Sequence, residues 1–252
     1  MSAPAPDHPT APSLVATPAD ETTPPTAAPA SDIRTPRGWL PIAAGAIAVL
    51  ACLVGFGLIA DEVREREAVA LDDLLTPLLH SIATPGLDQV MTGVTTLGST
   101  QVVLPLLVVV IVGLLWRNHR REAAFLVVAV AGSVLIDEVL KLVFHRPRPQ
   151  LTWSQVQPEY SFPSGHAMNS LVLWVSLGIV VGVLAGRRAG IVAVVGAVIL
   201  ALAIGTSRIY LGYHYFTDVV GGLLAGAAWL LIVVTAFGGL SWVRAARVGA
   251  RA

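Results

Sequence analysis

Three polar clusters in the second half of the chain combine residue types that suit the transfer of a phosphoryl group. Together they supply three cations, two histidines, one carboxylate and a Ser-Gly pair. A phosphoryl group in transfer spreads negative charge over three equatorial oxygens, so positioning and electrostatic stabilisation provide most of the catalysis. The clusters are Lys141-x6-Arg148-Pro149, Pro163-Ser164-Gly165-His166 and Ser207-Arg208-x5-His214-x3-Asp218.

The cations and the Ser-Gly pair form a predicted phosphate site. Lys141, Arg148 and Arg208 can bind the phosphate oxygens, and the guanidinium groups can do so through two N–H groups each. Ser164 and Gly165 precede an apolar run that begins a helix. Free backbone N–H groups and the helix dipole favour an anion there, and glycine allows a close approach of the backbone.

The histidines and the carboxylate form a predicted catalytic group. His214 and Asp218 are four residues apart, which places them on one face if the last helix has already begun. The carboxylate can then hold one ring nitrogen as N–H and leave the other free to attack phosphorus. His166 is left to protonate the departing oxygen, after which a water would cleave the phosphohistidine.

Membrane helices must position these residues, because the chain is too apolar for a soluble domain. Of its 252 residues, 55% are hydrophobic and 13% are charged, against about 25% charged in soluble domains. The apolar residues form blocks close to the length that crosses about 30 Å of hydrocarbon. We therefore predict an all-α polytopic membrane protein with six transmembrane helices, at about 39–60, 98–116, 123–144, 166–185, 190–206 and 216–237.

The segments outside the spans are predicted to be surface helices, a disordered N-terminal tail and a short basic C-terminal tail. Residues 61–97 hold seven acids and amphipathic stretches such as Leu71–Ile82, broken at Pro77 and Pro85, and these predict helices lying at the membrane surface. Residues 1–36 are rich in Pro, Ala and Thr and predict a disordered tail without the features of a removable signal peptide. The predicted organisation is thus a 1–36 tail, a 37–240 six-span domain and a short basic tail at 241–252.

The distribution of Lys and Arg predicts the orientation. Ten of the 16 basic residues lie in the tails and in the alternate loops that join them, so both termini should be cytoplasmic. The 40 residues between His166 and Ser207 allow one helix down and one back at about 1.5 Å per residue. The three clusters should therefore meet on the extracytoplasmic face. Basic residues at span ends are disfavoured on that face by the positive-inside rule, so those present there should have a role other than setting the orientation.

The three clusters resemble the signature of the type-2 phosphatidic acid phosphatase and vanadium haloperoxidase superfamily, with every motif position occupied. The resemblance covers about residues 39–237, and the six spans and surface helices are similar to the membrane lipid phosphatase branch. It implies a six-helix core, metal-independent hydrolysis, His214 as nucleophile and His166 as acid. It also implies phosphate contacts from Lys141, Arg148, Ser164, Gly165, His166 and Arg208.

Each of these residues also has a simpler interpretation. Basic residues at helix ends often extend toward lipid headgroups, lone histidines often serve in packing, and Asp218 could cap the last span. Asp137 and Glu138 lie one turn before Lys141 and could pair with it or with Arg208, or merely occupy an interfacial position. Arg146 could contact a second phosphate. The combined spacing favours the catalytic interpretation for the three clusters only.

The predicted function is hydrolysis of a lipid phosphomonoester or pyrophosphate at the outer membrane face. Phosphatidic acid, phosphatidylglycerol phosphate and polyprenyl diphosphates fit equally well, and the orientation favours substrates presented outside, such as an undecaprenyl-type carrier. The alternative is a lipid phosphotransferase that passes the phosphoryl group to an alcohol, whereas intact motifs on one face disfavour a non-catalytic scaffold, transporter or translocase.

We expect neither a metal nor another cofactor, and the lone Cys52 excludes a disulfide, a zinc site or an iron–sulfur cluster built from cysteines within one chain. The expected partners are a membrane lipid phosphate and the bilayer, without nucleic acid or an obligatory protein partner.

Overall fold

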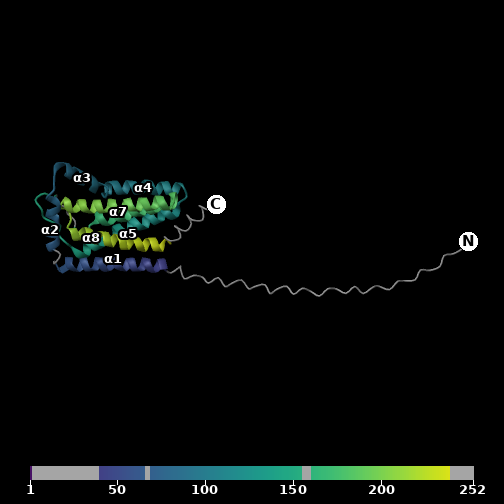
Figure 1. Ribbon diagram of the computed structural model, residues 1–252, viewed down its shortest axis with the longest axis horizontal. Coiled ribbons are helices and arrows are strands. Elements are labelled where there is room, and N and C mark those ends of the chain that lie inside the picture. The colour runs from purple at the N-terminus through teal and green to yellow at the C-terminus, as the bar shows by residue number, and fades with distance from the viewer. Residues whose placement is uncertain (2–39, 66–68, 155–159, 239–252) are drawn as a thin grey trace, which may run out of the picture. The chain divides into compact units, whose positions relative to one another are not determined.

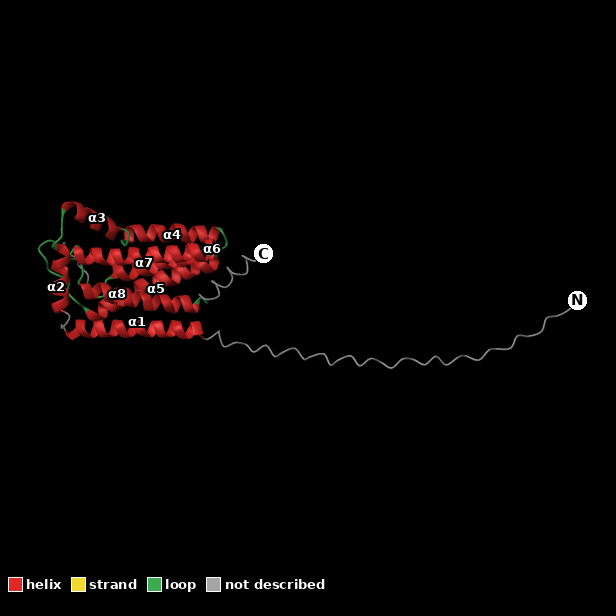
Figure 2. Cartoon of the chain, viewed as in Figure 1, coloured by secondary structure: helices red, strands yellow, loops and turns green. Residues whose placement is uncertain are grey.

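The computed structural model describes residues 1, 40–65, 69–154 and 160–238. The predicted tails at 1–36 and 241–252 lie outside the described residues, apart from Met1. The described chain is all-helical, with loops at the two ends of a bundle (Figures 1 and 2). Its helices are α1 (Leu40–Glu65), α2 (Val69–His80), α3 (Pro85–Thr96), α4 (Thr100–Trp116), α5 (Arg120–Phe144), α6 (Gly165–Ala185), α7 (Arg187–Tyr210) and α8 (Phe216–Ala236).

The helices confirm the predicted membrane fold, with one difference at the second span. Five helices (α1, α5, α6, α7 and α8) are long and apolar enough to cross a membrane, with mean hydropathies of 2.1 to 2.5. The sixth candidate is a pair, α3 and α4, bent by 40° at a short break. The predicted span at 98–116 corresponds to α4, which has only 17 residues and is long enough to cross a membrane only together with α3.

The two amphipathic helices have separate places. α2 lies across one end of the bundle and contacts α7 and α8, whereas α3 leads into α4 and packs on α7 (Figure 1). The predicted break at Pro77 is wrong, because α2 continues through it to His80. Contacts made by the buried Asp72 and Thr76 side of the helix outweigh the hydrogen bond that proline forfeits. Pro85 does begin a new helix, capped by the Thr84 hydroxyl, which accepts from the Leu87 N–H at 3.2 Å.

Small residues bring α6 close to α7 and α8. A methyl group added at Gly222 would lie 2.6 Å from the Ser164 carbonyl oxygen, and one at Gly226 would lie 3.0 Å from that of Met168. On the other side of α6, a methyl group at Gly190 would lie 2.5 Å from the Cα of Gly182. Such close backbone approach is how membrane helices gain packing energy without a hydrophobic driving force.

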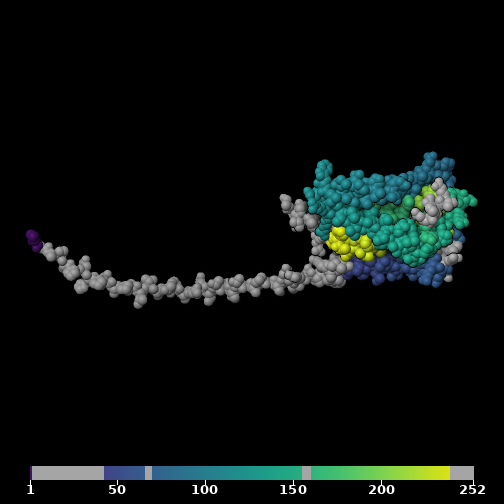
Figure 3. All heavy atoms as spheres, turned by 180° about the vertical axis from the view of Figure 1, so that it is seen from behind, coloured from purple at the N-terminus to yellow at the C-terminus, as the bar shows by residue number. Residues whose placement is uncertain are grey.

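The outer surface of the bundle is apolar. α1 forms one edge and α4 the opposite edge, and the view from behind shows the same arrangement (Figures 1 and 3). Leu50 on α1, Val109 on α4 and Val192 on α7 are exposed by 61%, 68% and 73%. Exposed apolar side chains along several helices indicate contact with lipid rather than water.

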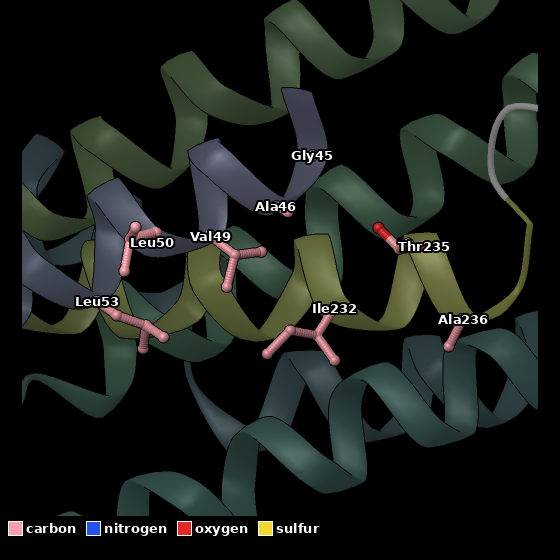
Figure 4. A pocket seen from close by; sticks show the side chains of 8 residues that line it. All are labelled: Gly45, Ala46, Val49, Leu50, Leu53, Ile232, Thr235 and Ala236. Carbon is pink, nitrogen blue, oxygen red and sulfur yellow. The ribbon is translucent and has the colours of Figure 1, made fainter. Parts of the chain in front are cut away.

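An open groove of about 500 Å³ lies between α1 and α8 (Figure 4). Leu50, Leu53 and Ile232 line it, and Thr235 is its polar lining residue. Thr235 donates its hydroxyl to the Leu231 carbonyl at 2.7 Å, so it presents no free donor to a ligand. The groove lies near the end of α8 that is remote from Asp218, so it is separate from the catalytic clusters.

Candidate active site

The fold brings the three polar clusters together at the end of the bundle that α2 covers. Lys141 lies in the last turn of α5, Arg208 in the last turn of α7, and Asp218 in the first turn of α8. His166 lies in the first turn of α6, and His214 lies in the turn between α7 and α8. Lys141, Arg148, Arg208 and His214 all lie near enough to the His166 ring to interact with it electrostatically, so the three clusters lie close together.

The two ring nitrogens of His214 have different partners. The Nε2 atom lies 3.0 Å from Nη1 of Arg148, and Nδ1 lies 3.4 Å from Oδ2 of Asp218. A guanidinium group has no lone pair to offer, so Nε2 must accept the hydrogen bond from Arg148. The proton of the neutral ring then resides on Nδ1 and points to Asp218. This is the tautomer that leaves Nε2 as a nucleophile.

The surroundings of His214 keep its ring neutral. Burial lowers the pKa of His214 to about 4, against the opposing effect of the Asp218 carboxylate. The positive charges of Arg208 and Arg148 lower this pKa further. A neutral ring at pH 7 has the lone pair that a nucleophile needs.

Asp218 contacts both the start of α8 and the His214 ring. Its Oδ2 atom accepts from the backbone N–H of Tyr215 at 2.9 Å as well as facing His214. Its main-chain carbonyl accepts from the Ser164 N–H at 2.9 Å, which ties α8 to the start of α6. The capping contact is therefore present, and the same buried side chain lies where it could orient His214, which stays a prediction.

The cations are held by specific neighbours. Lys141 lies 3.1 Å from Oδ2 of Asp137 and 3.7 Å from Oε1 of Glu138, so of the alternatives left open for these acids the pairing with Lys141 is present. Arg208 lies with its guanidinium carbon 4.3 Å from the centre of the Tyr213 ring and donates to Thr95 at 3.3 Å. Restrained cations of this kind can bind phosphate with little loss of side-chain entropy.

Arg148 is held by the main chain on one side of the nucleophile. Its Nη1 atom donates to the Tyr213 carbonyl at 2.9 Å in addition to facing His214. Arg148 is thus fixed beside Nε2 of His214, the nitrogen predicted to attack phosphorus.

The start of α6 has the features of an anion site. Ser164 is fully buried, and among the described residues its hydroxyl has no hydrogen-bond partner. Gly165 packs against Asp137, since a methyl group there would lie 2.4 Å from Oδ2 of that carboxylate. Phe162 anchors the preceding loop by packing against Phe144, with ring centres 4.9 Å apart. An unused buried hydroxyl at a helix N-terminus fits a phosphate oxygen.

Comparison with known proteins identifies the family. Residues 122–242 match the model of the PAP2 superfamily. In a crystal structure of a transmembrane PAP2-type phosphatidylglycerolphosphate phosphatase from Bacillus subtilis, the similarity covers 76% of this chain and 96% of that one, with a TM-score of 0.71 and 26% identity. The chain belongs to the PAP2 superfamily.

Two curated relatives place it among the membrane lipid phosphatases of that family. The PAP2 chain is 28% identical to phosphatidylglycerophosphatase B of Bacillus subtilis over 182 residues, which are 71% of this chain and 89% of the relative. It is 31% identical to an undecaprenyl-diphosphatase of Sulfolobus acidocaldarius over 124 residues, 45% of this chain and 54% of that one. The two relatives carry different substrate names.

The structure gives contacts that the sequence did not indicate for three residues around the PAP2 site, Arg146, Asp72 and Asp137. The suggestion that Arg146 contacts a second phosphate is wrong, because its guanidinium group is bound by Asp72, Thr217 and Asp218. Asp72 carried no sequence signal, since it precedes Arg146 by 74 residues and lies among other acids. Asp137 was detectable as an acid within a span, but only the packing against Gly165 reveals its role in the site.

The catalytic and phosphate-binding roles of the eight predicted residues stay predictions, although the PAP2 fold gathers all of them. Within the described ranges, no group of three or more His, Cys, Asp and Glu side chains is arranged to hold a metal ion.

Proposed function

We propose that this PAP2 protein hydrolyses a lipid phosphomonoester or pyrophosphate through a phosphohistidine on His214. The observation that supports this most directly is the arrangement of His214 between Asp218 and Arg148, at 3.4 and 3.0 Å. Asp218 would hold the proton on Nδ1, and Arg148 lies on the side of Nε2 where a phosphate would bind.

Binding of the phosphate would prepare the nucleophile. Lys141, Arg148 and Arg208 would bind its oxygens, together with the Ser164 hydroxyl and the backbone N–H groups that begin α6. As Arg148 turns its N–H from Nε2 of His214 to a phosphate oxygen, the lone pair of Nε2 becomes available for attack.

Two displacements then complete the reaction. Nε2 of His214 forms a bond to phosphorus while the bond to the lipid oxygen breaks, and protonated His166 gives its proton to that oxygen. Asp218 stabilises the charge that develops on the His214 ring. A water then attacks phosphorus and gives a proton to His166, the P–N bond breaks, and inorganic phosphate leaves with both histidines restored.

The substrate class follows from the relatives and from the charge distribution of the chain. We expect phosphatidylglycerol phosphate, phosphatidic acid or a polyprenyl diphosphate to be the substrate, since one relative is a phosphatidylglycerophosphatase and another an undecaprenyl-diphosphatase. The bias of basic residues toward the tails and alternate loops supports cytoplasmic termini and an extracytoplasmic site.

Phosphate release by the purified full chain in detergent, with EDTA present, tests the proposal. The three lipids would be compared in parallel with His214→Gln, and with His119→Gln as the matched control at the other end of the bundle. We expect release that persists in EDTA, is lost in His214→Gln and is unchanged in His119→Gln. Acid-labile phosphate trapped on the wild-type protein from labelled substrate would identify the intermediate.

Three results would contradict the proposal: release by His214→Gln, release abolished by EDTA, or no turnover of any of the three lipids. An added acceptor alcohol separates hydrolysis from phosphotransfer, because a transferase would form the alkyl phosphate in preference to inorganic phosphate.

A further inference from the structure

Helix α2 turns a carboxylate toward the bundle and leaves apolar side chains outside. Asp72 and Thr76 are 1% and 2% exposed, whereas Leu74 and Leu78 are 62% and 57% exposed. Burying a carboxylate is costly unless it is paired and hydrogen-bonded. The partners of Asp72 should therefore explain why this helix presents its polar side to the site.

Asp72 is fully engaged with the start of α8 and with the loop after α5. Its Oδ1 atom accepts from the Thr217 N–H at 2.9 Å. Its Oδ2 atom accepts from the Thr217 hydroxyl at 2.6 Å and from Nη2 of Arg146 at 2.7 Å. Thr217 immediately precedes Asp218 in the sequence, so α2 is bound to the turn that carries the predicted orienting carboxylate.

Arg146 connects this contact to Asp218 itself. Its Nη1 atom donates to Oδ1 of Asp218 at 2.6 Å and to the Thr217 hydroxyl at 2.7 Å. Its guanidinium carbon lies 4.2 Å from the centre of the Tyr215 ring. A planar guanidinium that is hydrogen-bonded at two nitrogens and stacked on an aromatic ring has little freedom to rotate.

The charge of Arg146 is retained in this environment. Burial acts to lower the pKa of Arg146, but the carboxylates of Asp218 and Asp72 together raise it above its usual value. One cation is thus shared by two buried carboxylates, and removal of Arg146 leaves both carboxylates without this compensating charge.

We propose that Asp72 and Arg146 are positioning residues for the PAP2 reaction, which hold the Asp218 carboxylate in the orientation that aligns His214. The inference rests on the proposed function of His214 as nucleophile. Because a carboxylate is planar, fixing its Oδ1 through Arg146 sets the direction in which Oδ2 meets Nδ1 of His214. That contact is long, at 3.4 Å, so its quality depends on how firmly Asp218 is held.

The two oxygens of Asp218 have different partners: one contacts Arg146, and the other contacts His214 and Tyr215. Arg146 approaches Oδ1, while His214 and the backbone N–H of Tyr215 approach Oδ2. The charged groups that face His214 itself are Asp218, Arg148 and Arg208. A change at Asp72 or Arg146 should therefore reach the nucleophile through Asp218, and it should leave the contacts of the phosphate-binding cations in place.

The test compares steady-state kinetics and phosphohistidine formation in three single variants of the full chain. They are Arg146→Gln, Asp72→Asn and the control Asp73→Asn, an exposed neighbour of Asp72 on the same helix. We expect Arg146→Gln to lower kcat per folded enzyme by about 10- to 100-fold, by analogy with residues that orient the ligands of a metal through a hydrogen bond. KM should stay within about twofold, because phosphate binding is not altered.

The second and third variants test the contact between Asp72 and Arg146. Asp72→Asn can keep an acceptor for the Thr217 N–H, but it loses the charge and the oxygen that accepts from Arg146. Arg146 retains Asp218 as a partner, so we expect a smaller loss of kcat in the same direction, and Asp73→Asn should match the wild type. In the double variant, Asp72→Asn should add less to the Arg146→Gln loss than it costs alone, since both residues act through Asp218. Size-exclusion profiles and Tm values in detergent supply the folded fraction.

Three results overturn the inference: an unchanged kcat in either Asp72→Asn or Arg146→Gln, a raised KM with unchanged kcat, or a loss that disappears after correction for folded enzyme. If Arg146→Gln fails to fold, the kcat of Asp72→Asn alone tests the inference. Failure of the proposed function would look different, because the wild type itself would then form no phosphohistidine.

Discussion

Replacement of Asp218 by Asn tests the orientation of the nucleophile most directly, because an amide cannot satisfy the contacts of both carboxylate oxygens. Oδ1 accepts from Arg146 at 2.6 Å, and Oδ2 faces Nδ1 of His214 and accepts from the Tyr215 N–H. Asn has one acceptor oxygen and one NH₂ donor. If the oxygen faces His214, the NH₂ group meets the guanidinium of Arg146, donor against donor.

The opposite orientation of the amide fails for a different reason. The NH₂ group would then face Nδ1 of His214 and require that nitrogen to be unprotonated. The proton would move to Nε2, which faces Arg148 at 3.0 Å and is the atom that must attack phosphorus. Both orientations of the introduced amide therefore impair the reaction, one by setting two donors against each other at Arg146 and the other by imposing the wrong tautomer of His214.

The size of the effect can be bounded from these contacts. Loss of a hydrogen bond to a charged group costs about 1.5–3 kcal/mol, and a change of tautomer in a Ser-His-Asp triad lowers kcat by about 10⁴. We expect kcat of Asp218→Asn to fall by about 10³, which corresponds to about 4 kcal/mol in the activation free energy. KM should change little, since the phosphate-binding cations are untouched.

The assay is phosphate release from the preferred lipid in detergent, with Asp61→Asn as the matched control because that carboxylate is exposed at the end of α1. A kcat within tenfold of the wild type in folded Asp218→Asn would show that His214 does not depend on Asp218. A raised KM with normal kcat would move Asp218 from orientation to substrate binding.

Two further predictions concern pH and packing. Because burial lowers the pKa of His214 to about 4, the loss of kcat/KM on acidification that is due to this ring should occur near pH 4 instead of 6.5, as measured in a pH–rate profile. The same shift makes the unfolded chain bind the extra proton first, so the contribution of His214 to the free energy of unfolding should fall as the pH drops from about 6.5 through 4. Gly222→Ala should destabilise the protein by about 1–3 kcal/mol, because its methyl group would lie 2.6 Å from the Ser164 carbonyl oxygen. A thermal unfolding scan would measure this loss, with Gly196→Ala as the control.

Clear results would contradict each of these. An acid limb of the pH–rate profile attributable to His214 near pH 6.5 would mean that its ring is not shielded from water as the structure shows. A Tm of Gly222→Ala equal to that of Gly196→Ala, where nothing lies within 4 Å of the added methyl group, would mean that α6 and α8 pack less closely.

The membrane class and the composition of the site were accessible from the sequence. The length of an apolar run is a local property, and it predicts a spanning helix whatever its neighbours are. The motif residues also lie close to helix ends, so alternating spans necessarily return Lys141, His166 and Arg208 to one side. The positions of most span boundaries followed from the same reasoning, and the break at Gly98 did not. A methyl group there would lie 2.6 Å from Oγ of Ser170, so the break packs closely against α6, a contact that no local pattern encodes.

The sequence by itself therefore determined that the chain spans a membrane and which cations, histidines and carboxylate form the candidate site. Only the tertiary structure decided how those groups are held: Asp137 against Gly165, Arg148 on Nε2 of His214, and Asp72 bound to Arg146 across 74 residues. The physical reason is that spacing along a helix specifies the face and the depth of a residue. The partner of a buried charge is specified by packing between segments that are distant in the chain.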